Sequence, residues 1–398
     1  MASACAGFLA AASTLNAPSA FADDTALILG HALLPTPDDS YMTQVMDTYI
    51  TPSFPGYNPV AVTTPETDYG SGLTQGVSDL DTAINQQLDA GNQVVVFGYS
   101  MSPSVVTQEM INLDALTTGQ PSTDDLSFIL AEDLNNPDGG IFTRFPGLGG
   151  VTLPATPADT PYDTTIYTIE YSGASDFPQY PSNVFADLNA EDGYLDLHPY
   201  LLPGWPAYFD PSEVANAVAQ NVSPGYGGNT DYFLIPTQDL PLLDGFRLMP
   251  GAPSAFADLI QPDMRVLVDL GYDWTGSADV TTAADWTSPT IDFTAVDSYL
   301  SAGADQGMIA ALVDLGILPQ SDLAGLADLY PYVPDVENLM DGALTNPDMA
   351  ALDAVTSLAA LTSDLSESTN PLAVELGAYL PGMAAQLAEY FQSLASFL

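Results

Sequence analysis

The chain of 398 residues is almost without basic side chains: it has three arginines and no lysine against 51 acids, and its formal net charge is −48. Proteins neutralise a nucleic-acid backbone with Lys and Arg, so charge-driven nucleic-acid binding is excluded. Binding to anionic lipid headgroups is excluded for the same reason. A Walker-type phosphate loop, which needs a lysine, is also excluded. Disorder is not implied, because 46% of the residues are hydrophobic.

Side chains that bind transition metals are equally scarce. There is one cysteine, Cys5, and there are two histidines, His31 and His198, without an H-x-x-H spacing. No D-x-D-x-D-G series suggests a calcium loop, and no G-x-G-x-x-G segment suggests a nucleotide. The sequence therefore predicts no metal and no cofactor.

The first 22 residues resemble the rear part of a secretory signal peptide. An apolar run from Ala4 to Leu15 is followed by Ala20-Phe21-Ala22, a typical cleavage site, before two acids. The basic start of such a peptide is missing, which leaves open whether Met1 is the true start; the alternative is a short buried helix. The run is too short to cross a bilayer and no later segment is suitable, so we expect no transmembrane span. The signal peptide predicts a protein that is secreted or located in the cell envelope.

From residue 25 onward, short apolar runs alternate with helical patterns. Leu73, Val77, Leu80, Ile84 and Leu88 recur at helical spacing. Such alternation predicts an α/β fold with a parallel sheet and crossover helices over residues 23–274. Residues 275–398 are rich in Ala, Leu and Asp and predict a helical C-terminal region, with a partly ordered tail as the alternative. Strands are expected at 25–29, 59–64, 93–97, 126–131, 164–171 and 232–235, helices at 41–49, 73–88, 105–113, 211–221 and 262–270, and loops at 132–162 and 199–230.

The most informative segment is Gly98-Tyr99-Ser100-Met101-Ser102, which joins the apolar run Val94–Phe97 to a helical pattern. A sharp strand-to-helix turn of this kind lifts a serine hydroxyl above the sheet, and small residues beside it let the backbones approach. Ser100 is therefore the predicted nucleophile, and the N–H of Met101 is a predicted arm of an oxyanion hole. The alternative is an ordinary strand–turn–helix in which a serine caps the helix.

A serine nucleophile needs a base and an acid that orients it. In α/β-hydrolases the order is Ser, acid, His, and only His198 follows Ser100. The acid is expected at the carboxyl end of a strand between them, and Asp176 is the first choice, with Asp187 as the second.

After the first strand, the loop with Gly30 and His31 is expected to supply the second oxyanion N–H. The His31 side chain either lines the pocket or belongs to an ordinary loop.

Six segments of the chain match a known family pattern: Val62–Glu66, Val95–Ser100, Asp176–Pro181, Ala186–Ala190, Asp239–Leu242 and Leu267–Tyr272. They resemble the PE-PPE domain of mycobacteria and their relatives, a serine α/β-hydrolase domain similar to cutinases. The resemblance runs from about Thr25 to Asp273 and implies a triad of Ser100, Asp176 and His198. Where the family usually has Tyr-Asp-Gly and often a Gln after the nucleophile, this chain has Tyr171-Ser172-Gly173 and Met101. It resembles stand-alone members without the PE or PPE module.

These observations predict a serine ester hydrolase that acts on acyl esters of lipids or glycolipids. The resemblance adds an alternative, an acyltransferase that moves acyl chains between trehalose-type glycolipids. A second alternative is a non-catalytic envelope or partner-binding protein that keeps the fold, and it rests on the unusual residues His31, Met101 and Ser172. Acyl chain length and oligomeric state cannot be predicted from the sequence.

Overall fold

A computed structural model of the chain describes residues 24–198, 211–248, 252–273, 275–287 and 290–323, with single positions between 378 and 392. Its centre is a seven-stranded sheet of order β2-β1-β3-β4-β5-β7-β6. All neighbouring strands are parallel except β6, which is antiparallel to β7. The strands are β1 (Thr25–Ile28), β2 (Asn58–Ala61), β3 (Val94–Tyr99), β4 (Leu126–Ala131), β5 (Asp163–Ile169), β6 (Val218–Ala219) and β7 (Thr230–Ile235).

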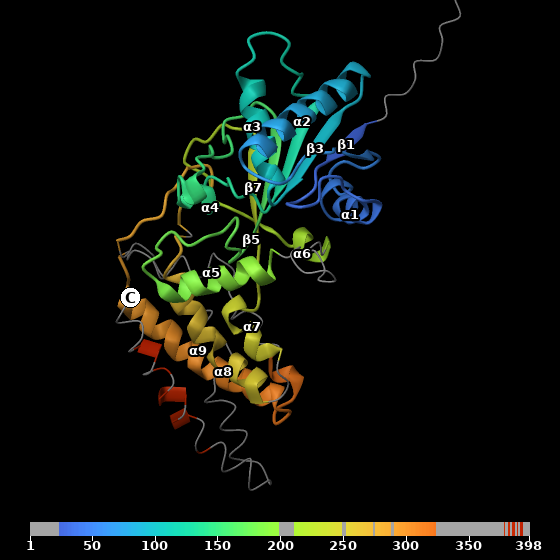
Figure 1. Ribbon diagram of the computed structural model, residues 1–398. Coiled ribbons are helices and arrows are strands. Elements are labelled where there is room, and N and C mark those ends of the chain that lie inside the picture. Colours follow the sequence, from blue (N-terminus) through green and yellow to red (C-terminus); the bar gives the residue numbers. More distant parts are fainter. Residues whose placement is uncertain are drawn as a thin grey trace, which may run out of the picture.

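Helices cover both faces of this sheet, which explains why its central strands are apolar throughout (Figure 1). In β3, Val94 and Val96 pack in a cluster with α2 and α3, while Val95 and Phe97 pack with α1 and the π-helix η1. The helices are α1 (Asp39–Val45), η1 (Met46–Ile50), α2 (Ser71–Asp89), α3 (Ser102–Asp114), α4 (Ile141–Arg144), α5 (Val184–Asp196), α6 (Pro211–Ala215), α7 (Pro241–Arg247), α8 (Ala252–Asp269), α9 (Phe293–Asp314) and the 3₁₀ turns η2 (Leu148–Gly150) and η3 (Gln320–Leu323).

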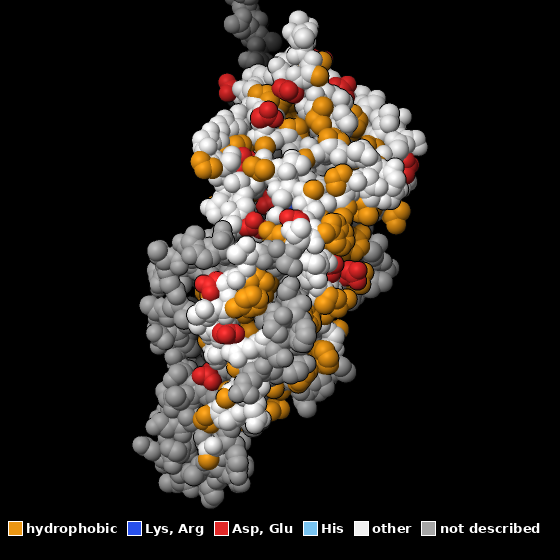
Figure 2. Space-filling model, turned by 90° about the vertical axis from the view of Figure 1, so that its left-hand side faces the viewer, with side chains coloured by type: hydrophobic (Ala, Val, Ile, Leu, Met, Phe, Trp, Pro, Cys, Tyr) orange, Lys and Arg blue, Asp and Glu red, His pale blue; other side chains and the backbone are white. Residues whose placement is uncertain are grey.

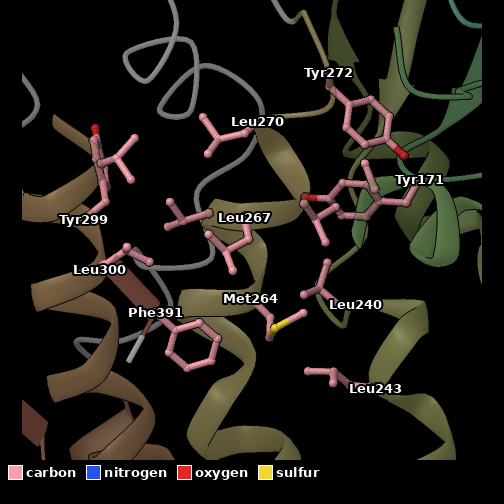
Figure 3. Close-up of a cluster of buried hydrophobic side chains, with 14 of the residues drawn as sticks. Tyr171, Leu240, Leu243, Met264, Leu267, Leu270, Tyr272, Tyr299, Leu300 and Phe391 are labelled. Atoms are coloured by element: carbon pink, nitrogen blue, oxygen red, sulfur yellow. The ribbon is translucent and has the colours of Figure 1, made fainter. Parts of the chain in front are cut away.

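A second core lies beyond the ends of β5 and β7, where α5, α7, α8 and α9 gather (Figures 1 and 3). Leu267 of α8 and Leu300 of α9 are fully buried in it, together with Tyr171, which follows β5. Close approach of α8 and α9 requires small residues, because a Cβ at Gly307 would lie 2.0 Å from the carbonyl oxygen of Leu259. The helical layer thus rests on the same end of the sheet as the predicted nucleophile.

The three arginines all serve the fold. Arg144 pairs with Asp138 at 2.8 Å, Arg265 pairs with Glu170 at 2.9 Å, and Arg247 pairs with Asp258. Arg247 also lies 3.4 Å from Asp239, so each arginine neutralises acids in its own surroundings. On the face drawn in Figure 2, acidic side chains are scattered among hydrophobic ones and do not form a single patch.

The predicted α/β class is confirmed, and each predicted strand is present with small shifts of its ends. Three expectations are wrong in extent. The helix expected at 211–221 ends at Ala215 because a short strand, β6, follows it; the helix expected at 262–270 begins at Ala252 and contains Pro262; and the loop expected at 132–162 includes α4 and η2. The sequence did not predict α5 or α7. The boundary at residue 274 stays a prediction.

The predicted signal peptide, residues 199–210 of the second loop and most of the predicted C-terminal region lie outside the described residues. Within the described part of the chain, no helix combines the length and the apolar character that a membrane crossing requires.

Candidate active site

Ser100 occupies a strained turn between β3 and α3. Its φ of 65° lies in the left-handed region, which non-glycine residues rarely adopt. Gly98 makes the turn tight, since a Cβ there would lie 3.1 Å from the backbone nitrogen of Pro103. The hydroxyl of Ser102 donates to the carbonyl of Tyr99 at 3.1 Å and holds the turn closed. This is the geometry that the Gly-x-Ser-x-Ser pattern predicts for a nucleophile elbow.

His198 joins Ser100 to a carboxylate. Its Nε2 lies 2.8 Å from Ser100 Oγ and its Nδ1 lies 2.9 Å from Glu132 Oε2. All three residues are about 1% exposed, so bulk water does not compete for these contacts. The chain Ser–His–Glu has the connectivity of a catalytic triad.

Glu132 directly follows β4, the neighbour of the nucleophile strand. Its φ of 53° turns the chain sharply at the strand end. One carboxylate oxygen accepts from the backbone N–H of Ile169 at 2.8 Å and from the hydroxyl of Ser175 at 2.6 Å; the other faces His198 and also accepts from Ser172. Four donors thus fix the carboxylate in place, as a group that orients an imidazole requires.

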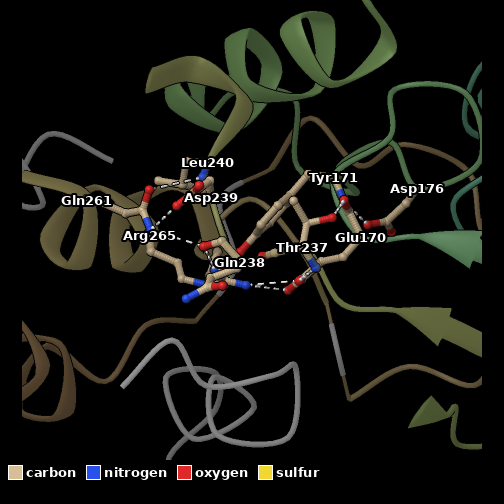
Figure 4. Close-up of polar contacts among 10 residues, drawn as sticks. Glu170, Tyr171, Asp176, Thr237, Gln238, Asp239, Leu240, Gln261 and Arg265 are labelled. Atoms are coloured by element: carbon tan, nitrogen blue, oxygen red, sulfur yellow. Dashed lines mark hydrogen bonds and ion pairs between the residues drawn. The ribbon is translucent and has the colours of Figure 1, made fainter. Parts of the chain in front are cut away.

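The structure does not bring the expected acids to the base: His198 contacts Glu132, and neither Asp176 nor Asp187 contacts His198. Asp176 accepts a hydrogen bond from the backbone N–H of Tyr171 at 2.7 Å and stabilises the turn after β5 (Figure 4). Burial raises the pKa of Asp176 well above its usual range. Asp187 lies in the first turn of α5 whereas His198 follows its last turn, and at 1.5 Å per residue roughly 16 Å of helix separates them.

The turn that carries Asp176 is itself anchored by a buried ion pair. Arg265 of α8 contacts both carboxylate oxygens of Glu170 at 2.9 Å, and the same carboxylate accepts from the N–H of Thr237 at 2.7 Å (Figure 4). The end of β5 is therefore fixed to the helical layer. This anchoring positions Ser172 and Ser175, which bind Glu132.

Met101 directly follows Ser100, and the loop with Gly30 and His31 follows β1, the strand beside β3; the oxyanion roles of these residues stay predictions. Met101 is the N-cap residue of α3, so its N–H is at the positive end of the helix dipole. Gly30 lets the first loop fold tightly, because a Cβ there would lie 2.0 Å from the carbonyl oxygen of Leu34. Burial lowers the pKa of His31, the hydrogen bond with the carbonyl of Ala32 raises it, and the proximity of His198 lowers it further.

No cluster of three or more His, Cys, Asp or Glu side chains suited to a metal ion occurs among the described residues. The arrangement that these residues do form is a hydrogen-bonded nucleophile, base and acid, which is suited to acyl transfer.

Comparison with known proteins identifies the family to which the chain is similar. The model of the PE-PPE domain matches residues 35–273. The chain is 41% identical over 363 residues to the PE family protein PE3 of Mycobacterium tuberculosis, a match that covers 88% of this chain and 75% of PE3. It is 43% identical over 303 residues to the esterase PE16 of the same organism, covering 72% of this chain and 56% of PE16.

A more distant relative is the SL1278 acyltransferase Chp1 of M. tuberculosis, 31% identical over 206 residues, which cover 51% of this chain and 48% of Chp1. The chain thus spans about half the length of the relatives whose names state an activity. No solved structure matches it.

Proposed function

The chain belongs to the PE-PPE domain family, and we propose that it is a serine enzyme that cleaves acyl esters of lipids or glycolipids with Ser100, His198 and Glu132. Relatives named as an esterase and as acyltransferases place it among enzymes of the hydrolase or acyltransferase type. The single observation that carries the residue assignment is the continuous contact from Ser100 Oγ through the His198 ring to Glu132. A non-catalytic protein has no need for this connected chain, which is why we set that alternative aside.

In the proposed mechanism, Ser100 Oγ attacks the ester carbonyl while His198 Nε2 accepts its proton. Glu132 accepts the hydrogen bond from His198 Nδ1–H and stabilises the imidazolium that forms. His198 then gives the proton to the leaving alcohol oxygen, and an acyl-enzyme remains on Ser100. Water or another hydroxyl compound, activated by the same base, releases the acyl group.

The negative oxygen of the tetrahedral intermediate needs donors that are already in position. We assign one to the backbone N–H of Met101 at the start of α3, and the second to the loop with Gly30 and His31. The departures from the family pattern at Met101 and His31 do not remove these donors, because backbone N–H groups supply them. The acyl chain is proposed to lie along loops 132–162 and 199–230, and residues 199–210 of the second loop are outside the described part.

The acyl acceptor distinguishes hydrolysis from transfer. The esterase PE16 suggests water, and the acyltransferase Chp1 suggests a hydroxyl of a second lipid or sugar. Incubation with an acylated trehalose donor and a free sugar acceptor separates the two outcomes: free fatty acid identifies an esterase, and net gain of acylated acceptor identifies a transferase.

Secretion or attachment to the cell envelope remains part of the proposal and is tested by fractionation of expressing cells.

The proposed reaction is tested with p-nitrophenyl esters of several chain lengths. Wild-type protein is expected to release p-nitrophenol, and Ser100→Ala is expected to reduce turnover by at least about 10³-fold. Ser104→Ala is a matched control, since Ser104 lies in α3 and contacts Asn135 rather than His198. Turnover that survives in Ser100→Ala, or that is absent with every ester, contradicts the proposal.

A further inference from the structure

Two tyrosine rings stack on the imidazole of His198. The ring of Tyr99 lies 5.4 Å from it with planes 13° apart, and the ring of Tyr194 lies 5.3 Å from it with planes 15° apart. Tyr99 is fully buried, whereas Tyr194, on α5, is 36% exposed. Tyr194 therefore stands between the imidazole and the surface of the molecule.

The backbone around Tyr194 is held by unusually close contacts. A Cβ at the preceding residue, Gly193, would lie 2.1 Å from the carbonyl oxygen of Tyr171. A Cβ at Gly173 would lie 2.3 Å from the carbonyl oxygen of Ala190, and 3.1 Å from Cβ of Tyr194. Two glycines thus let α5 lie directly on the turn after β5. The same contact between α5 and this turn therefore holds both Tyr194 and the residues that bind Glu132.

The end of α5 brings Tyr194 and His198 together. Tyr194 lies in the last turn of the helix, and His198 directly follows its C-cap residue Leu197, so the two rings come into contact where the helix ends. His198 Nδ1 and Nε2 are both engaged in the ring plane, by Glu132 and Ser100, so the two flat faces are the remaining surfaces. An aromatic ring on such a face excludes water and attracts the imidazolium through its π electrons.

We propose that Tyr194 is a positioning residue of the active site, whose ring covers His198, keeps water from it and holds the imidazole in the plane that joins Ser100 to Glu132. The inference rests on the proposed function for its catalytic consequence, but the cover itself does not require turnover. The ring, rather than the phenolic hydroxyl, carries this role. Removal of the ring is expected to lower kcat more than it changes KM, because the base is affected and the acyl site is not.

The test compares Tyr194→Phe, which keeps the ring, with Tyr194→Leu, which keeps only apolar bulk. Leu188→Ala is the control, since Leu188 is an exposed residue of the same helix, nearly three turns before His198. On a p-nitrophenyl ester, Tyr194→Leu is expected to lose about tenfold in kcat with KM within about twofold. Tyr194→Phe and the control are expected to stay within about twofold of wild type.

A second measurement uses the scarcity of histidine. Diethyl pyrocarbonate modifies accessible neutral imidazoles, and the chain offers only His31 and His198. Mass spectrometry of each site is expected to show His198 modified several times faster in Tyr194→Leu than in wild type, with His31 unchanged as the internal standard. Unfolding temperatures confirm that each variant is folded.

The two measurements separate the proposals. Equal kcat and equal His198 modification in wild type and Tyr194→Leu overturn the role of Tyr194, as does a Tyr194→Phe variant as impaired as Tyr194→Leu. If wild-type protein has no esterase activity, the proposed function fails, while faster His198 modification in Tyr194→Leu still establishes the cover. If Tyr194→Leu does not fold, Tyr194→Phe still tests the proposal. This variant is expected to keep wild-type activity and wild-type protection of His198, and loss of either one contradicts the role of the ring.

Discussion

At the scale of single residues, the base could be predicted from the sequence because histidine is rare in this chain. With two histidines in the chain, the order of residues left His198 as the base, and the structure brings it to Ser100. The acid could not be found in this way, because fifteen acids lie between Ser100 and His198. A usable signal was present: Glu132 directly follows the strand at 126–131, which neighbours the nucleophile strand in the sheet. Asp176 follows a later turn and faces the backbone of Tyr171 instead.

Glu132→Gln is expected to separate the two candidate acids. The amide cannot accept from Ser172, Ser175 and His198 in the same way, and its NH₂ group favours the wrong tautomer of the imidazole, so kcat should fall by roughly 10³- to 10⁴-fold. Asp176→Asn should leave kcat within about threefold of wild type. Burial raises the pKa of Asp176 and so favours its neutral form, and an amide oxygen can still accept from Tyr171.

Steady-state kinetics on a p-nitrophenyl ester, with circular dichroism to verify folding, make the comparison. A folded Asp176→Asn variant that is as inactive as Glu132→Gln would return the catalytic role to Asp176. Equal activity of Glu132→Gln and wild type would exclude Glu132.

At the scale of elements, strands were more predictable than helices. A central parallel strand is buried on both faces and appears as an unbroken apolar run, as in Val94–Tyr99. Helix α5 gave no such signal, because its apolar side chains lie on all sides: Ala186 and Ala190 are buried while Val184, Leu188 and Leu195 are exposed. Helix α8 was predicted too short because Pro262 lies inside it, where proline usually marks a helix start.

The interface of α8 and α9 contains a buried carboxyl that the sequence could not indicate. Both carboxyl oxygens of Asp263 are buried without a hydrogen-bond partner, and a Cβ at Gly303 of α9 would lie 2.3 Å from one of them. Burial raises the pKa of Asp263 to about 8, and the charge of Asp305 adds to this effect. The folded protein therefore holds a proton there that the unfolded chain, with an ordinary pKa near ~3.9, releases.

Stability should consequently fall as pH rises. Between the two pKa values the folded state binds more protons than the unfolded state, so the contribution of Asp263 is full below about pH 4 and is lost up to about pH 8. Asp263→Asn should remove this dependence. Between pH 5 and pH 8 the wild-type free energy of unfolding should decrease by about 3–4 kcal/mol more than that of the variant.

Urea unfolding at pH 5, 6, 7 and 8 measures the difference. Asp297→Asn is the matched control, because it makes the same Asp-to-Asn change at an exposed position of α9. Parallel pH profiles for Asp263→Asn and wild type would refute a neutral carboxyl in this interface.

At the scale of the whole molecule, the missing bases set the electrostatics. Arg144, Arg247 and Arg265 each hold a local ion pair, so the remaining acids repel one another without a compensating cation. The formal net charge of −48 is larger than the folded state needs for solubility, and repulsion of this kind destabilises a compact state relative to an extended one. The fold tolerates it because its cores are large and its buried acids are held by donors or kept neutral.

Salt should therefore stabilise this protein. The Debye length falls from about 14 Å at 0.05 M to about 4 Å at 0.5 M ionic strength, which screens repulsion between acids on the surface. The buried pair of Arg265 and Glu170 is shielded from the ions and should keep its strength. We expect the unfolding temperature to rise by roughly 3–8 °C between 0.05 and 0.5 M NaCl at pH 7. Glucose at equal osmolality, which does not screen charge, should give a smaller rise, and an unfolding temperature that falls with NaCl would show that ion pairs outweigh the repulsion.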